Sequence, residues 1–287
     1  MWRKVTPYLY LVPALAFVGF FLLAPMVRTL LYSFTDYRGL VSMNIVWLEN
    51  YVAFFNDPVF LRSFLNTLVW VAATLAFPVL GGLLLALLVR GIRLEELYKF
   101  VIFLPLTISF VTTGIIWGWM FSFQLGVINR LLEAVGLASF RQPWLAQYPL
   151  NNFSMILAWT WQSTGLNMVL FLMGLTTMPN EPLEAAMIDG ASRATLFRRI
   201  VLPMLRPITT VVVGIALINS FKVFDLIYVM TNGGPARKSE VLAITMFRES
   251  FTEYRMGYGA AIAIILAILI LAVSTIYVRQ MALKEER

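Results

Sequence analysis

The sequence lacks cysteine and histidine altogether, and only 13% of its 287 residues are charged. The missing residue types exclude disulfides, thiol nucleophiles, thiolate or imidazole metal ligands and histidine acid–base catalysis. A soluble domain carries about 25% charged residues. With 60% hydrophobic residues and a mean hydropathy of +0.80, the composition predicts an all-α polytopic membrane protein.

A phosphate-binding loop is missing as well. Such a loop needs glycines whose amides surround the phosphates, followed by Lys-Ser or Lys-Thr at the start of a helix. The nearest match, residues 233–239, has Arg237 where a glycine should precede the lysine. We therefore expect this chain to bind no cofactor and to hydrolyse no ATP. The net charge of +7 is scattered over short loops, so nucleic acid is not an expected partner.

Six apolar runs are long enough to cross a bilayer, which takes roughly 20 residues. They cover residues 8–29, 67–89, 101–123, 153–175, 208–230 and 258–278. The first run follows Arg3 and Lys4 and has no small-residue cleavage site, so we interpret it as an uncleaved anchor. Basic residues are densest near both termini and in segments 90–99 and 193–206. The positive-inside tendency therefore predicts that both termini are cytoplasmic.

A polar, basic segment, EAAMIDGASRATLFRRIVLPMLRP, separates the fourth run from the fifth. Just before it, Pro182 suits the first turn of a helix, while Gly190 suits a left-handed helix end and Ser192 the cap of a second helix. The pattern predicts two short helices that meet at a glycine corner on the cytoplasmic side. The alternative is a basic loop that only lies on lipid headgroups.

This segment resembles the EAA loop of bacterial ABC-importer permeases, the loop that couples the permease to its ATPase. The matching positions are Glu184, Ala185, Ala186, Asp189, Gly190, Ala191, Phe197, Leu202 and Pro203. Residues 47–68 and 224–235 resemble the sugar importers of the maltose, lactose and glycerol-phosphate permease family. The predicted outer loop, about residues 35–66, is short, as in the compact members of that family.

The resemblance implies a type I ABC importer permease in the cytoplasmic membrane of a bacterium or archaeon. Residues 1–65 would form a peripheral first helix and outer loop, 66–280 the core with coupling loop 178–207, and 281–287 a cytoplasmic tail. The implied partners are a second, identical or homologous permease, two ATPase subunits that carry ATP and Mg²⁺, an extracytoplasmic solute-binding protein and the lipid bilayer. The implied activity is sugar uptake by alternating access, with no chemistry performed by this chain.

Polar residues inside the apolar runs are candidates for the substrate path. Lys222 and Asp225 are three residues apart, so we expect them to share a helix face and to pair. The other candidates, which could offer a sugar hydrogen bonds or an aromatic face, are Asn219, Tyr228, Trp159, Gln162 and Asn167. Alternatively, the ion pair only holds helices together and the tryptophan only packs or anchors. Gly82 and Pro105 are expected to serve helix packing and bending.

The competing function is a stand-alone secondary carrier or a membrane enzyme that acts on lipid. A secondary carrier typically has repeated halves with interrupted helices at matching places, and the sequence shows no such symmetry. A lipid enzyme needs a group of carboxylate, histidine or serine side chains near one membrane interface, and no such group is evident. The sequence favours the importer permease.

Overall fold

The computed structural model of the chain describes residues 2–39, 43–221 and 223–285. Within these ranges the fold is helical, and its one β pairing is an isolated antiparallel bridge between Thr35 and Ile45. The first half of the chain contains α1 (Trp2–Val18), α2 (Ala24–Tyr32), α3 (Glu49–Ala53), α4 (Pro58–Val89), α5 (Glu95–Phe103), α6 (Phe110–Met120) and α7 (Val127–Ala134). The second half contains α8 (Leu150–Thr176), α9 (Glu181–Ile188), α10 (Arg193–Leu196), α11 (Leu202–Met204), α12 (Arg206–Phe221), α13 (Asp225–Thr231), α14 (Leu242–Phe251) and α15 (Met256–Glu285). The predicted all-α fold is confirmed.

Helices occupy all six apolar runs, but two of the runs are not single helices. The third run is bent by 101° between residues 95–107 and α6. In the fifth run Val223 and Phe224 are not helical, and they lie between α12, which ends at Phe221, and α13, which begins at Asp225. By length and composition, three of the described helical stretches could each cross a membrane, or five if each bent pair is one span. The six-span topology and the cytoplasmic termini stay predictions.

The centre of the bundle is the crossing of α4 and α8. A side chain at Gly82 would place its Cβ 2.5 Å from Cβ of Asn167, so only glycine lets the two helices approach this closely. On the opposite side of α8, a Cβ added at Gly165 would lie 2.4 Å from the carbonyl oxygen of Ile102 in α5. Helix α8 is therefore held between α4 and α5, and the predicted packing role of Gly82 is confirmed.

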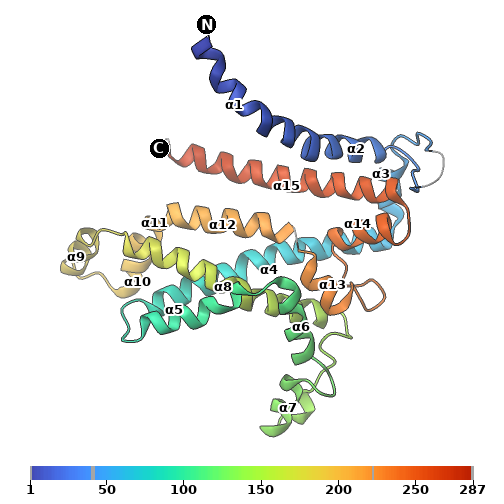
Figure 1. Cartoon of the computed structure of the whole chain (residues 1–287). Helices are drawn as coiled ribbons and strands as arrows, with labels where there is room; N and C mark the ends of the chain where they lie inside the picture. The colour runs from blue at the N-terminus through green and yellow to red at the C-terminus, as the bar shows by residue number, and fades with distance from the viewer. Residues whose placement is uncertain (1, 40–42, 222, 286–287) are drawn as a thin grey trace.

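Buried apolar clusters run along the bundle from end to end. One end is filled by Val89, Leu175, Met178, Val201 and Leu205, the middle by Trp70, Met155, Trp159, Leu226 and Ile227, and the other end by Phe54, Phe60, Leu242, Tyr258 and Ile262. These clusters place α9, α10 and α11 at one end, and α3, α14 and the start of α15 at the other (Figure 1). We call them the α9 end and the α14 end.

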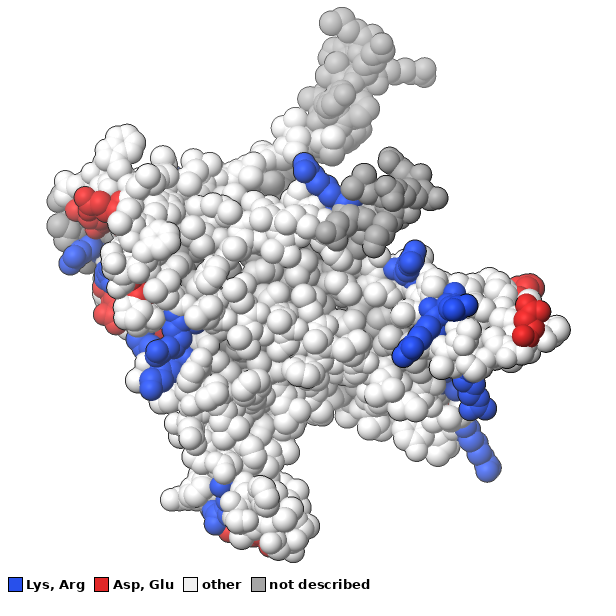
Figure 2. All heavy atoms as spheres, turned by 180° about the vertical axis from the view of Figure 1, so that it is seen from behind, with Lys and Arg blue, Asp and Glu red and all other residues white. Residues whose placement is uncertain are grey.

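The flanks of the bundle are apolar and exposed. The stretch Tyr10–Tyr32 has none of its most apolar window buried against the rest of the chain, and α1 diverges from α15 towards its N-terminus (Figure 1). Figure 2 shows Lys, Arg, Asp and Glu gathered at the two ends and on the projecting lobe around α7, with a broad uncharged surface between them. An uncharged belt between charged ends is the pattern expected of a protein embedded in a bilayer.

Candidate functional site

The α9 end has the two short helices that the sequence predicts. Pro182 lies in the first turn of α9. The helix stops at Gly190, whose φ of +78° is a left-handed conformation, and the amide of Ala191 closes the turn by donating to the carbonyl of Ala186 (2.9 Å). The Ser192 hydroxyl then accepts a hydrogen bond from the Thr195 amide and caps α10. The glycine corner between two helices is confirmed.

The tip of this segment is exposed. Ile188 at the end of α9 is 86% exposed and Met187 is 57% exposed, although both are large and apolar. Glu184 and Asp189 are exposed beside them. The base is anchored because Phe197 packs on the buried cluster of the α9 end. An apolar tip flanked by carboxylates, on a base fixed to the bundle, has the form of a contact site for another protein.

The other coupling candidates lie around this tip and its base. Ala185 and Leu202 are exposed, whereas Ala186, Ala191 and Pro203 are half-buried. Pro203 does not end its helix, because it lies in the first turn of α11. Instead, the chain bends by 68° between Met204 and Arg206, where α12 begins. The roles of these residues in coupling stay predictions.

The candidate path residues differ in exposure. Asn219, Asp225 and Tyr228 are exposed, whereas Trp159, Gln162 and Asn167 are buried. Helix α12 ends at Phe221 and α13 begins at Asp225. Lys222 lies outside the described residues, so both its expected shared helix face and its pairing with Asp225 stay predictions.

The buried candidates make contacts that hold the bundle together. The Trp159 ring stacks on Phe110 with 4.2 Å between centroids. Gln162 Nε2 donates to the carbonyl of Ile108 (2.7 Å), which lies at the break before α6. In a membrane, a carbonyl released by a break needs a partner within the protein. Gln162 therefore stabilises the bend of the third run, a role that its sequence position does not reveal.

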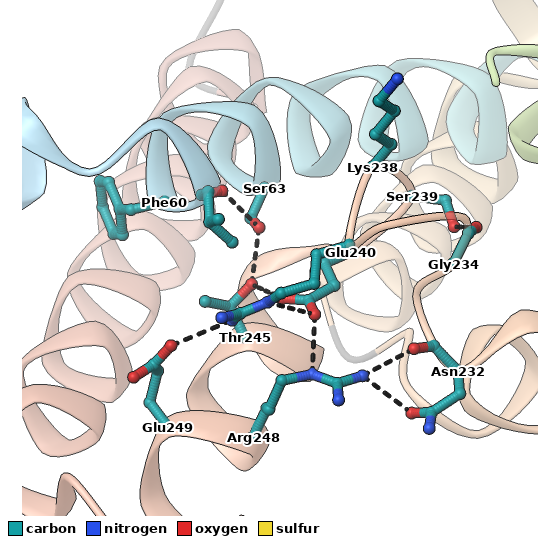
Figure 3. Close-up of polar contacts among 12 residues, drawn as sticks. Phe60, Ser63, Asn232, Gly234, Lys238, Ser239, Glu240, Thr245, Arg248 and Glu249 are labelled. Carbon is teal, nitrogen blue, oxygen red and sulfur yellow. Dashed lines mark hydrogen bonds and ion pairs between the residues drawn. The ribbon is translucent and has the colours of Figure 1, made fainter. Parts of the chain in front are cut away.

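The α14 end contains an ion cluster around two buried glutamates, which the sequence did not reveal. It consists of Arg237, Glu240, Arg248, Glu249 and Arg255 (Figure 3 draws part of it). Glu240 is completely buried, and one of its oxygens accepts from Nε of both Arg237 and Arg248 at 2.8 Å. Glu249 joins two arginines through different oxygens: one oxygen accepts from Arg237 Nη2 (3.0 Å) and the other from Arg255 Nη1 (3.1 Å). Every carboxylate oxygen of the cluster is thus paired.

The loop that carries Arg237 is fixed to the helices around it. Asn66 of α4 donates to the carbonyls of Lys238 and Glu240, both at 2.8 Å. Asn151 of α8 donates to the carbonyl of Gly234 (2.7 Å). Burial lowers the pKa of Arg237, but hydrogen bonds and Coulomb attraction from Glu240, and then from Glu249, outweigh it and raise the pKa above its usual value. Arg237 is therefore permanently charged in a fixed position.

Residues 233–239 resemble a phosphate loop in part, and the sequence gives no sign of which partners their charges meet. The pattern that could have revealed the cluster is the alternation of arginine and glutamate within residues 237–255. In the part of the chain that the structure describes, no three His, Cys, Asp or Glu residues are grouped so that they could hold a metal ion.

Comparison with known proteins decides the family. Residues 78–283 match the family described as binding-protein-dependent transport system inner membrane component. The chain belongs to this family. A similar relative is a probable ABC transporter permease protein of Pyrococcus horikoshii, 37% identical over 98% of each chain. Another is the arabinooligosaccharides transport system permease protein AraP of Bacillus subtilis, 35% identical over 96% of this chain and 88% of the relative.

A solved structure has the same fold. It is a chain of a bacterial alginate ABC transporter, crystallised with its alginate pentasaccharide-bound periplasmic protein, with a TM-score of 0.83 and 23% identity over 96% of this chain and 95% of that one. The predicted type I importer permease fold is therefore confirmed. The permease is a multi-pass membrane subunit of an ABC transporter, and the findings favour this function over a stand-alone carrier or a lipid enzyme.

Proposed function

We propose that this permease forms, with a second permease subunit, the path by which a sugar or a related polyol or glycoside enters the cell. The substrate class is supported by the relatives, whose names specify arabino-oligosaccharides and alginate. Both likenesses extend over nearly the whole chain. The membrane is the cytoplasmic membrane of a bacterium or archaeon, and an extracytoplasmic binding protein delivers the substrate.

The observation that carries the proposal is the exposed tip of the α9 end. Ile188 and Met187 present apolar surface that nothing in the described chain covers, and Glu184 offers a carboxylate to a cationic group. The corner at Gly190 fixes the direction of α9 relative to α10. We assign this tip to the contact with an ATPase subunit, so that movement of the ATPase is transmitted through α10 to α12.

We assign the energy source to two ATPase subunits that hold ATP and Mg²⁺. Residues 233–239, the segment of this chain most similar to a phosphate-binding loop, bind the bundle rather than a phosphate. The amide of Ser239 donates to the carbonyl of Gly233 (3.1 Å), and the Ser239 hydroxyl donates to that of Gly234 (2.5 Å). A loop closed on itself in this way has no open cradle of amides for phosphate oxygens. Purified alone, the permease should neither bind nor hydrolyse ATP.

The test is uptake by cells whose own permease is replaced by Glu184→Ala or Gly190→Pro. Proline fixes φ near −65° and cannot adopt the left-handed corner, and alanine removes the carboxylate of the tip. We expect uptake of the labelled sugar to fall to background in both variants, while the permease stays at its normal level in the membrane. Normal uptake in both variants would show that the α9 end takes no part in coupling transport to the ATPase.

A matched control separates coupling from the charge of the surface in general. Glu253 is an exposed glutamate at the α14 end, and Glu253→Ala should leave uptake unchanged. Co-purification gives a second readout, since an affinity-tagged permease should retain its ATPase partners, and Glu184→Ala should retain fewer. A tagged wild-type permease that retains no ATPase would overturn the proposed function itself.

A further inference from the structure

The α14 end has a cavity of about 500 Å³ beside the ion cluster. It lies between the turn after α3, the loop before α14 and the segment that leads into α15 (Figure 1). Its polar lining consists of Asn56, Asp57, Arg237, Glu249, Arg255 and Tyr258. The hydrogen-bonding partners of these side chains decide which kind of ligand the cavity can bind.

The carboxylates of the cavity already have partners. Asp57 accepts from the amide of Val59 (2.8 Å) with one oxygen and from the Tyr258 hydroxyl (2.7 Å) with the other. Each oxygen of Glu249 accepts from an arginine. A cationic ligand would have to compete with these partners, so the cavity is poorly suited to a cation.

Several donors around the cavity remain unused. Among the described residues, Arg237 donates through Nε and Nη2 but not Nη1, and Arg255 donates through Nη1 but neither Nε nor Nη2. The exposed side-chain amide of Asn56 has no hydrogen-bonding partner there either. Glu240 and Glu249 hold Arg237 in place. Guanidinium groups fixed in this way match the oxygens of a carboxylate or a phosphate.

The charge of the lining is balanced, because its two arginines are matched by two carboxylates. Long-range attraction therefore adds little to the binding of an anion. A small free anion would gain only short-range hydrogen bonds here, and it would lose its hydration in return. A ligand of this cavity needs a further source of affinity, such as apolar contact next to its anionic group.

An apolar pocket adjoins the cavity and offers that contact. It shares Ala53 with the cavity, and its other lining residues are Val46, Trp47, Leu48, Glu49 and Val52. Trp47 is 72% exposed, Leu48 and Val52 are each 59% exposed, and the charged Glu49 is exposed as well. Tryptophan is enriched where a membrane meets water, because its ring is apolar and its N–H group is polar.

The apolar pocket is continuous with the flank of the bundle. The amide of Val46 donates to the carbonyl of Phe34 (2.9 Å), so the pocket lies just beyond the end of α2. The stretch Tyr10–Tyr32 has none of its most apolar window buried, and Leu31 near its end is 60% exposed. An anionic group in the cavity and acyl chains along the pocket and α2 would therefore occupy one continuous surface.

We propose that the cavity and the apolar pocket together form a binding site for an anionic phospholipid. The lipid phosphate accepts hydrogen bonds from Arg237 and Arg255, and the acyl chains lie against Trp47 and Val52. Asn56 donates to the phosphate or accepts from a hydroxyl of the headgroup, which favours phosphatidylglycerol. The site requires only that the permease is embedded in a bilayer, so it is independent of the transported substrate and of the direction of transport.

The test is native mass spectrometry of the full-length permease, purified with the subunits that accompany it and titrated with phosphatidylglycerol. A diacylglycerol with the same acyl chains is the matched lipid, since it lacks only the phosphate headgroup. We expect phosphatidylglycerol to bind at least about tenfold more tightly, because its phosphate adds charge-assisted hydrogen bonds. Excess inorganic phosphate should not displace it, because a free ion makes no contact with the apolar pocket.

Asn56→Asp is the variant that disturbs the fold least, because the side chain is exposed, has no partner among the described residues and keeps its shape. The added carboxylate would repel the phosphate, and the affinity for phosphatidylglycerol should fall about tenfold or more. Arg255→Gln should have a similar effect. Its matched control is Arg62→Gln, because Arg62 is an exposed arginine of α4 that lines neither pocket. If Arg255→Gln also lowers the midpoint of thermal unfolding, Asn56→Asp decides the question.

A second readout locates the acyl chains. Phosphatidylglycerol with brominated chains should quench the fluorescence of the wild-type permease more than that of Trp47→Phe, because bromine quenches the tryptophans that it contacts. Phenylalanine keeps an apolar ring in the pocket, so the affinity of this variant should change little. The difference in quenching therefore reports contact with Trp47 and not the strength of binding.

Four outcomes would overturn the inference. Equal affinity for phosphatidylglycerol and diacylglycerol, or unchanged affinity in Asn56→Asp, would show that no phosphate occupies the cavity. Displacement by inorganic phosphate would assign the cavity to a free anion. An equal loss in Arg62→Gln would reduce the effect to general surface charge, and equal quenching in Trp47→Phe would show that the chains lie elsewhere. None of these results depends on sugar uptake, which tests the proposed function separately.

Discussion

The two ends of this permease differ in how their polar residues are used. At the α14 end, five charged residues pair with one another and three of the neighbouring structural elements are tied together by side-chain hydrogen bonds. At the α9 end, Glu184 and Asp189 are exposed, and neither forms an ion pair with a described residue. One end is fixed internally, whereas the other leaves its polar and apolar groups available to a partner.

This difference suits a bundle that transmits movement from one end. A partner that binds the α9 end can move its helices together only if the α14 end keeps them in a constant arrangement. Buried ion pairs are poor sources of net stability, but breaking one by removing a single partner is costly. We expect the α14 end to keep its geometry while the α9 end is moved, and mutations at the two ends should fail in different ways.

The largest effect is expected from Glu240→Ala. Removal of this buried carboxylate leaves Arg248 without its ion-pair partner and Arg237 with Glu249 alone, and breaking a buried pair in this way costs about 3–5 kcal/mol. The permease should become scarce in the membrane, and the midpoint of thermal unfolding in detergent should fall. Glu184→Ala at the α9 end should leave the membrane level and the unfolding midpoint unchanged. If both variants lost stability equally, the two ends would not differ in how they hold the fold.

A smaller effect is expected from Gln162→Leu, in the middle of the bundle. Leucine fills the space but leaves the carbonyl of Ile108 without its partner, at a cost of about 1–2 kcal/mol. Thermal unfolding should shift moderately, and hydrogen exchange should rise in residues 108–112. Thr160→Val, which removes a hydroxyl bonded only within α8, is the control. Unchanged exchange near Ile108 would mean that water or lipid satisfies the carbonyl.

The smallest effect is expected from Ser192→Ala at the α9 end. Loss of a helix cap costs about 1 kcal/mol, which corresponds to a roughly fivefold increase in local opening. Hydrogen exchange should rise in α10 alone, and Ser192→Asp should restore protection. A rise that spread to α14 would show that the two ends are coupled more tightly than their separate packing suggests.

The sequence predicted the parts that depend on local chemistry. Ser192 and Gly190 set the limits of their helices through preferences of their own backbone and side chain, so their places could be predicted without the fold. The long helices α4 and α15 follow from long, mostly apolar stretches, and the close crossing at Gly82 follows from the lack of a side chain.

The parts that depend on distant partners could not be predicted. The bend before α6 is stabilised by Gln162, which is 54 positions away from Ile108. Glu240 is buried because Arg237, Arg248 and Thr245 converge on it in space, and each of these residues also suits an exposed loop. The end of α12 at Phe221 breaks an apolar run whose composition favours a continuous helix.

The choice of residue at the Gly190 corner is limited by backbone handedness rather than by the space for a side chain. Apart from Gly190 and its two chain neighbours, no described residue has an atom within 4 Å of the position where a Cβ would be, so a methyl group would have room there. What the site disfavours is the L-configuration at φ of +78°, which costs about 1–2 kcal/mol. A D-alanine introduced there by chemical ligation would favour this backbone, whereas L-alanine would be strained. The corner therefore depends on the stereochemistry of one residue.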